Sequence, residues 1–246
     1  MKTKRFFYLL LAFFLFTFIW MLLPISVLAH GIYTGGTKGN DISWPQCGTS
    51  SFPQNSFGIV GVTGGRAFTE NPCLSQEFVW AHALSTPASL YMNLNSPIGS
   101  TASKGMTGPY GNCKKNDKLC QAENYGYNAA QYAYTYAQQQ GASSSQWWLD
   151  IEIANSWSSS ATLNQGTING AAKFFSDKSI KLGVYSSQRM WNSITGGYQN
   201  GLPAWLATTA TTPATYCSST YSFTGGQMYL VQYSNSATSI DSDYAC

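Results

Sequence analysis

The residues of this chain that are best suited to do chemistry are Asp150 and Glu152, two positions apart in the apolar run 147–153. Side chains alternate across a β-strand, so both acids and Trp148 are expected on one face, opposite an apolar face of Trp147, Leu149, Ile151 and Ile153. Burial raises the pKa of a carboxyl, and a second carboxylate nearby raises it further. One acid can then stay protonated while its neighbour stays charged, as cleavage of a glycosidic bond requires.

The elements that must position these acids form an alternating pattern. Short apolar segments end in polar or glycine-rich sequence, and several are separated by stretches that could be helical, which predicts a parallel sheet. Eight strands, enough to close a barrel, are expected at a segment ending at 41–43 and at residues 57–62, 90–93, 147–153, 182–186, 204–207, 228–233 and 240–241.

Helices are predicted at residues 78–84, 122–140 and 167–177. The second has tyrosines and alanines at helical spacing and stops at Gly141, a common C-terminal signal. The connections between residues 207 and 240 are too short, or too rich in Gly, Thr and Ser, for good helices. The last third of the barrel is therefore expected to lack helical cover.

In such barrels the working site lies at the carboxyl ends of the strands. Asp41, Asp150, Glu152 and Asp241 all fall at predicted strand ends, and Asp243 follows closely. The chain has only 10 acidic residues, so this concentration exceeds what scattered surface charge would produce. We expect a carboxylate cluster around a sugar-binding cleft.

Composition supports a carbohydrate partner and argues against nucleic acid. The 16 tyrosines and 8 tryptophans exceed what one core needs, and exposed rings stack well on sugar faces. Of the 13 basic residues, three lie within the first five positions, which leaves ten against ten acids in the rest of the chain. A near-neutral domain has no basic patch for a nucleic acid.

The N-terminus indicates export. The three early basic residues precede 24 uncharged residues, 6–29, that end in Val27-Leu28-Ala29. Residues 1–29 are therefore expected to be a signal peptide or an uncleaved membrane anchor, since the run is long enough to span a bilayer. Residues 30–246 are expected to form one extracellular or envelope-bound domain, in contact with a membrane only through that segment.

All six cysteines follow the export segment, and an even count in an exported chain favours disulfides. We expect Cys113 to pair with Cys120 across a polar loop, and the remaining four to join strand ends, as Cys47 with Cys73 and Cys217 with Cys246. The spacings do not suit zinc, and His82 is the only histidine well inside the domain. No metal and no cofactor are expected.

Seven segments in order along the chain resemble glycoside hydrolase family 25, the lysozymes typified by fungal and bacteriophage muramidases. The first, Gly39-Asn40-Asp41-Ile42-Ser43-Trp44-Pro45-Gln46, resembles the family's opening strand. The others are residues 57–62, 148–152 with Asp150 and Glu152, 183–187, 202–207, 231–234 and 240–244.

The resemblance implies a (β/α)5β3 barrel, a TIM-like α/β fold whose late helices are missing, here stapled by disulfides. It also implies cleavage of the β-1,4 bond between N-acetylmuramic acid and N-acetylglucosamine in peptidoglycan. Glu152 would be the proton donor, Asp150 would orient the N-acetyl group or stabilise the developing positive charge, and Asp41 and Asp241 would hold the cluster and the sugar. The attacking group can be the substrate's own N-acetyl oxygen.

The same resemblance implies a set of substrate-binding residues around the cleft, although each aromatic among them could equally serve as core packing. The set comprises Trp44, Tyr91, Asn93, Tyr185, Trp205, Gln232 and Tyr233.

The chain departs from the family pattern at four places. Gly61-Val62-Thr63-Gly64-Gly65-Arg66 replaces a Lys-Ala-Thr-Glu-Gly type sequence, and Val231 stands where Trp is common. Tyr91-Met92-Asn93 replaces a Tyr-His-Phe type sequence, and an insert from Ser96 to Cys120 follows it. These changes keep the acids but reshape the floor and wall of the cleft, which indicates a divergent branch.

We therefore predict a monomeric, secreted or membrane-anchored enzyme that hydrolyses a glycan, with peptidoglycan as the polymer. The alternative is a non-catalytic carbohydrate-binding or cell-envelope module on a hydrolase-like barrel. A disulfide-stapled adhesion domain would leave the inward acids unexplained. A binding module has no need for four converging acids, whose mutual repulsion costs stability.

Overall fold

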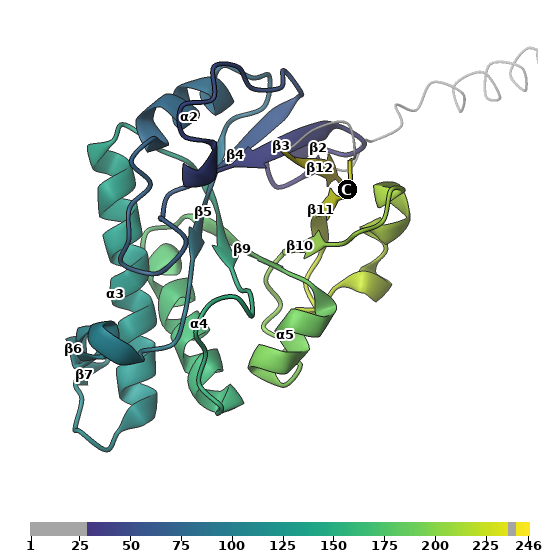
Figure 1. The fold of residues 1–246 in the computed structure, drawn as a ribbon. Coiled ribbons are helices and arrows are strands. Elements are labelled where there is room, and N and C mark those ends of the chain that lie inside the picture. Colours follow the sequence, from purple (N-terminus) through teal and green to yellow (C-terminus); the bar gives the residue numbers. More distant parts are fainter. Residues whose placement is uncertain (1–28, 236–239) are drawn as a thin grey trace, which may run out of the picture.

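The computed structural model describes residues 29–235 and 240–246, and its centre is a closed barrel of eight strands (Figure 1). Round the barrel the order is β10-β11-β12-β3-β4-β5-β8-β9. The predicted closed α/β barrel is confirmed, with a strand at each of the eight expected places. Their bounds are β3 Lys38–Ile42, β4 Phe57–Gly61, β5 Ser89–Asn93, β8 Gln146–Asp150, β9 Lys181–Ser186, β10 Ala204–Ala207, β11 Met228–Tyr233 and β12 Asp241–Ala245.

Strand β8 shows the expected alternation of faces but is shorter than predicted. Trp148 points into the barrel, where it packs with Tyr33, Phe57, Trp205 and Leu230, while Trp147, Leu149 and Ile151 belong to the layer beneath the helices. The prediction that the strand and its apolar face extend to Ile153 is wrong. The strand ends at Asp150, and Ile153 is 58% exposed because the chain turns away from the barrel there.

Strand β12 differs from the predicted short strand at residues 240–241. It begins at Asp241 and runs antiparallel to both neighbours, β11 and β3. Asp241 therefore lies at the amino end of its own strand, yet at the rim where the parallel strands have their carboxyl ends. Because this last strand is reversed, Asp241 pairs with Asp41 of β3.

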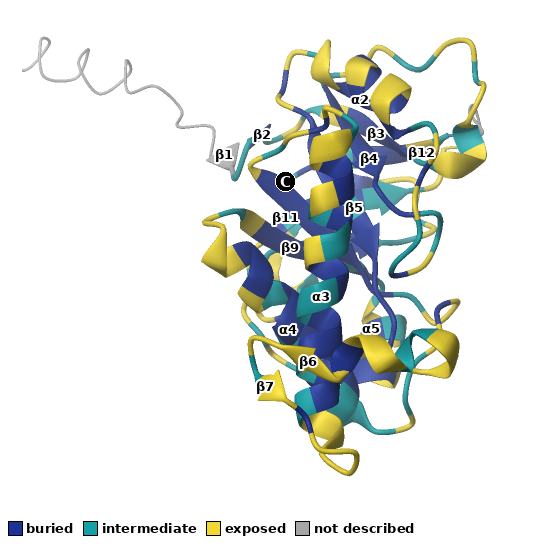
Figure 2. Cartoon of the chain, turned by 90° about the vertical axis from the view of Figure 1, so that its left-hand side faces the viewer, coloured by how far each residue is buried: buried dark blue, intermediate teal, exposed yellow. Residues whose placement is uncertain are grey.

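In the described part of the chain, four α-helices cover one side of the barrel, and the exposed residues of these helices face outward (Figure 2). They are α2 Leu74–His82, α3 Lys118–Gln139, α4 Ala161–Asp177 and α5 Gln188–Thr195. Helix α5 was not predicted, although its signals are ordinary: the Ser187 hydroxyl accepts from the backbone N–H of Met190, and Gly196 ends the helix with φ of 69°.

Only 3-10 turns connect the late strands in the described part of the chain, namely η4 Pro213–Cys217 and η5 Ser219–Tyr221, as expected from the composition there. The connection from β3 to β4 likewise holds only the 3-10 turn η2 Trp44–Gln46, so its helix is missing as well.

The insert after β5 folds against α3. It contains the 3-10 helix η3 Gly99–Gly105 and the small hairpin β6 Thr107–Gly108 with β7 Gly111–Asn112. The Asn128 side chain on α3 donates hydrogen bonds to the carbonyls of Lys104 and Thr107, which joins the insert to the helix. A second hairpin, β1 Ala29–His30 with β2 Tyr33–Thr34, precedes the barrel.

All three expected disulfides are present: Cys47–Cys73, Cys113–Cys120 and Cys217–Cys246. The predicted signal peptide or anchor lies outside the described residues except for Ala29. Within the described ranges, every helix is too short or too polar to cross a bilayer.

Helices α3 and α4 approach each other closely because glycine faces the partner's backbone. A Cβ atom on Gly126 would lie 1.8 Å from the carbonyl oxygen of Thr167, and one on Gly170 would lie 1.9 Å from that of Glu123. By contrast, a Cβ on Gly166 would meet the end of the Leu119 side chain at 2.7 Å, and Leu119 is 42% exposed and free to turn away.

We predict that Gly126→Ala lowers the free energy of unfolding by about 3 kcal/mol, since the backbone clash outweighs the better helix propensity of alanine. Gly166→Ala is the matched control and should change that free energy by less than about 1 kcal/mol. Urea unfolding of the disulfide-intact protein measures both. Equal effects of the two substitutions would contradict the close backbone contact.

Candidate active site

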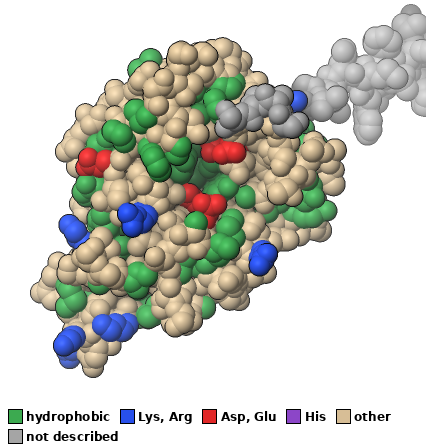
Figure 3. All heavy atoms as spheres, in the orientation of Figure 1, with side chains coloured by type: hydrophobic (Ala, Val, Ile, Leu, Met, Phe, Trp, Pro, Cys, Tyr) green, Lys and Arg blue, Asp and Glu red, His purple; other side chains and the backbone are tan. Residues whose placement is uncertain are grey.

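The predicted acids meet in one cavity at the carboxyl rim of the barrel. The cavity has a volume of about 170 Å³. Figure 3 shows acidic side chains beside a central hollow on this face, with hydrophobic side chains next to them. The lining residues are Asp41, Tyr91, Asp150, Glu152, Tyr185, Trp205, Gln232 and Asp241.

Asp41 lies at the centre of a hydrogen-bonded chain that links two further strands. Its Oδ2 accepts from Gln232 Nε2 at 3.0 Å, and Gln232 Oε1 accepts from the Tyr185 hydroxyl at 2.7 Å. Burial, and then the nearby charge of Asp241, raise the pKa of Asp41 to about 7. Asp41 therefore holds a proton under mildly acidic conditions.

Asp243 is a fifth acid of the cluster and was not among the predicted site residues. It is fully buried, accepts from Trp205 Nε1 at 2.9 Å and shares a hydrogen bond with the Asp41 carboxyl. Burial and the charge of Asp41 raise the pKa of Asp243 well above its usual range. The sequence spacing could have predicted this position, because Asp241 and Asp243 are two residues apart and therefore share a strand face.

Asp150 is held by an amide behind the cavity. Asn93 Nδ2 donates to Asp150 Oδ2, while Asn93 Oδ1 accepts from the Thr63 hydroxyl at 2.6 Å. The other carboxyl oxygen, Oδ1, is buried without a hydrogen-bond partner among the described residues. Burial raises the pKa of Asp150 well above its usual range, with the charges of Glu152 and Asp41 adding to the effect.

Glu152 lies just beyond the end of β8 and is partly exposed. Trp157 Nε1 and the backbone N–H of Asn155 both donate to its backbone carbonyl, at 2.8 and 3.1 Å, which fixes the turn that presents its side chain. Partial burial, followed by the charge of Asp241, raises the pKa of the Glu152 carboxyl. A protonated acid that solvent and substrate can reach is suited to donate its proton.

The remaining predicted residues divide into three groups. Tyr91, Tyr185, Trp205 and Gln232 line the cavity, and Asn93 supports it through Asp150. Trp44 and Tyr233 do not line it: Trp44 is 48% exposed on η2, and Tyr233 is partly buried at the end of β11. Their sugar-binding role stays a prediction.

No Lys or Arg in the described residues forms an ion pair with any of these five acids. No three His, Cys, Asp or Glu side chains in that part of the chain are grouped so as to hold a metal ion. The excess negative charge is therefore relieved by retained protons and by neutral donors such as Gln232, Asn93 and Trp205.

Comparison with known proteins agrees with this fold. Residues 118–223 match the family described as Lys-1, lysozyme-like protein 1. That range contains Asp150 and Glu152, whereas Asp41 and Asp241 lie outside it. Comparison with curated protein sequences finds no match.

Several solved structures share the barrel. The bacterial lysozyme from Streptomyces coelicolor is 17% identical, with a TM-score of 0.54 over 87% of this chain and 93% of that one. The family GH25 lysozyme from Aspergillus fumigatus is 14% identical, with a TM-score of 0.52 over 85% and 93%. The modular Cpl-1 endolysin, complexed with a peptidoglycan analogue, is 16% identical, with a TM-score of 0.54 over 86% and 54%.

Residues 118–223 are thus similar to a lysozyme-like family, and the barrel has the fold of glycoside hydrolase family 25 lysozymes. The resemblance drawn from seven short segments is confirmed at the level of the fold, and the proteins that share it are glycoside hydrolases.

The raised pKa values predict that the protein becomes less stable as pH rises from about 4 to about 7. The unfolded chain loses these protons near the ordinary aspartate pKa of 3.8, whereas folded Asp41 keeps its proton up to about 7. Asp243→Asn preserves the shape and the hydrogen bonds but removes one titrating group. The slope of unfolding free energy against pH should become shallower by up to about 1.4 kcal/mol per pH unit.

Urea unfolding of both proteins at several pH values between 4 and 7 measures this slope. An unchanged slope in Asp243→Asn would show that Asp243 does not retain a proton in the folded state.

Proposed function

We propose that this protein is a glycan hydrolase that cleaves the β-1,4 bond between N-acetylmuramic acid and N-acetylglucosamine in peptidoglycan, with Glu152 as the general acid. The observation that carries the proposal is one cavity lined by Asp41, Asp150, Glu152 and Asp241, the acids at predicted strand ends. The glycan bound in the Cpl-1 endolysin structure supports the substrate class.

The proton donor is assigned to Glu152 because it combines a raised pKa with access from the cavity mouth. It gives its proton to the glycosidic oxygen as the bond to the anomeric carbon breaks. Its carboxylate can then take a proton back from the group that enters.

Asp150 acts on the sugar that becomes positively charged. Its unpartnered Oδ1 is available to orient the N-acetyl group of the substrate, whose carbonyl oxygen attacks the anomeric carbon. Positive charge that develops on the sugar ring lowers the pKa of Asp150, because an opposite charge favours the ionised form. Asp150 therefore stabilises the charged sugar in its ionised form, its proton having passed to solvent water. Asp41 and Asp241 hold the sugar from the opposite side of the rim.

Export and a monomeric state complete the proposal. Residues 1–29 direct the chain out of the cytoplasm as a signal peptide or stay as its anchor, and residues 30–246 act as a single domain. Three disulfides are typical of an oxidising compartment, where a wall polymer is also found.

Glu152→Gln should lower the rate of peptidoglycan hydrolysis by at least about 100-fold, because the amide has no proton to donate. The dissociation constant for glycan should change by less than about threefold, since shape and hydrogen bonding persist. Release of new reducing ends, identified by mass, measures the rate and should reveal a muramic acid end.

Glu123→Gln is the matched control, because Glu123 is also partly buried and has a raised pKa but lies on α3 outside the cavity. It should keep full activity. Full activity in Glu152→Gln would refute the role of Glu152, and glycan binding without hydrolysis by the unaltered protein would favour the non-catalytic module.

Activity should be greatest at mildly acidic pH and fall as pH rises through the raised pKa of Glu152, where the general acid loses its proton. A pH profile of kcat/KM on soluble glycan fragments measures this. Activity that keeps rising beyond pH 8 would contradict a carboxylic acid as donor.

A further inference from the structure

A second, larger cavity lies beside the acids and is built by two of the segments that depart from the family pattern. Its volume is about 440 Å³, within the range of ligand pockets, and it is lined by the loop after β4, residues 66–69, and by the insert, residues 98–101. Asn95 and Ser156 complete the wall. No acid is among the lining residues, in contrast to the neighbouring cavity.

This cavity opens at the same rim as the acids, because its walls come from the segments that follow the carboxyl ends of β4, β5 and β8. The loop after β4 contributes Thr63 to the support of Asp150 and then Arg66 to the second cavity. The segment after β5 contributes Asn93 and then Asn95. The turn after β8 contributes Glu152 to one cavity and Ser156 to the other.

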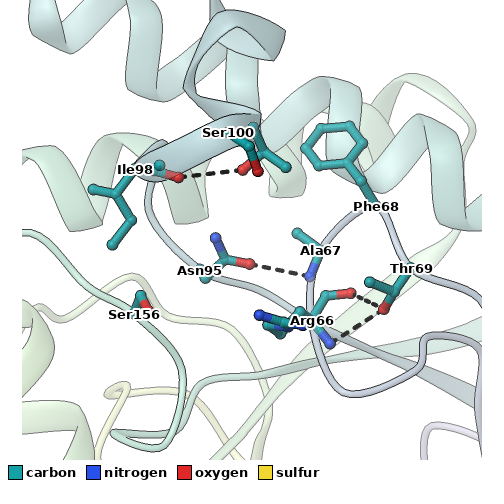
Figure 4. Close-up of a pocket in the computed structure, with 10 residues that line it drawn as sticks. Arg66, Ala67, Phe68, Thr69, Asn95, Ile98, Ser100 and Ser156 are labelled. Atoms are coloured by element: carbon teal, nitrogen blue, oxygen red, sulfur yellow. Dashed lines mark hydrogen bonds between the residues drawn. The ribbon is translucent and has the colours of Figure 1, made fainter.

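The loop that carries Arg66 is held in one shape. The Thr69 hydroxyl accepts from the backbone N–H of Arg66 at 3.3 Å and donates to its carbonyl at 2.6 Å, while the N–H of Ala67 donates to Asn95 Oδ1 at 3.0 Å. Figure 4 shows these bonds, with Arg66 between Ser156 and Thr69 in the view. The next residue, Phe68, packs its ring against Tyr125 with centroids 5.1 Å apart.

The backbone of Arg66 is thus fixed, whereas its guanidinium is uncommitted. No carboxylate in the described residues pairs with it, and no hydrogen bond of that side chain occurs within the same ranges. The hydroxyls of Ser100 and Ser156 likewise have no partner within the described chain, and Ile98, 41% exposed, adds an apolar wall. A guanidinium with flanking hydroxyls and an apolar wall is suited to a carboxylate on a short carbon chain.

We infer that this cavity binds a carboxylate-bearing peptide or acyl branch of the glycan, with the carboxylate at Arg66, while the acids hold the sugar to which the branch is attached. This inference rests on the proposed function, because it assumes a branched glycan in the acid-lined cavity. Arg66 is the cation of a cavity whose lining has no acid, so a negatively charged branch meets no carboxylate there.

The test uses binding, so that its result does not depend on turnover. Calorimetry measures the affinity of the Glu152→Gln protein for soluble peptidoglycan fragments with free branch carboxylates, and for the same fragments after conversion of those carboxylates to methylamides. Amidation should weaken binding about tenfold, the usual loss for one charge-assisted hydrogen-bonded contact. Adding Arg66→Gln should lower the affinity for the acidic fragments by the same factor and abolish the difference between the two forms.

Lys181→Gln, added to Glu152→Gln, is the control, because it removes one positive charge from an exposed residue at the opposite rim, where β9 begins. It should retain the tenfold difference. The inference is overturned if amidation has no effect, if the difference survives Arg66→Gln, or if neither form binds. Hydrolysis by the unaltered protein is scored separately, so a protein that discriminates the fragments without cleaving them would retain this inference and lose the proposed function.

Discussion

The site depends on one constraint: five carboxyl groups share a small rim with no cation of the described chain paired to them. Three of them, Asp41, Asp150 and Asp243, are buried, so full ionisation would combine desolvation with mutual repulsion. The cluster is compatible with a folded protein because it retains protons and because neutral donors take up part of the remaining charge. An acid catalyst needs a carboxyl group that retains its proton. The crowding and burial of the acids therefore cause both the electrostatic cost and the proposed acid catalysis.

The neutral donors link the acids to other strands, so that single contacts become connections across the barrel. Tyr185 on β9 orients Gln232 on β11, which donates to Asp41 on β3. Trp205 on β10 donates to Asp243 on β12. Because each link joins different strands, the strand positions and the acid positions are set together.

Two departures from the family pattern prove to be neighbours. Thr63 lies in the altered segment after β4, and Asn93 ends the altered strand β5. In the fold the Thr63 hydroxyl donates to Asn93 Oδ1 and accepts from the backbone N–H of Asn93, and Asn93 holds Asp150. The changes are therefore complementary: a compact hydroxyl–amide pair supports the acid, and the loop beyond it is free to present Arg66.

The sequence by itself determined the eight strands of the barrel, three of its helices and most of the acids. Apolar segments of strand length, helical spacing up to Gly141 and the paucity of helix formers after residue 207 depend on local chemistry, which is why the barrel and its missing late helices were predictable. Asp41, Asp150 and Glu152 follow from their place at the ends of such segments. Ile153 was misplaced because nothing in its apolar run marks where the strand leaves the barrel.

Only the tertiary structure decided how the distant parts meet. The reversal of β12, which places Asp241 opposite Asp41 and buries Asp243 against Trp205, depends on strand pairing over about 200 positions of sequence, and no local signal encodes strand direction. The second cavity, which residues 66–69 form together with the insert, likewise depends on contacts between segments that are distant in sequence. Composition and spacing predict which face of each segment is buried. Barrel closure and strand register decide which side chains line the same cavity.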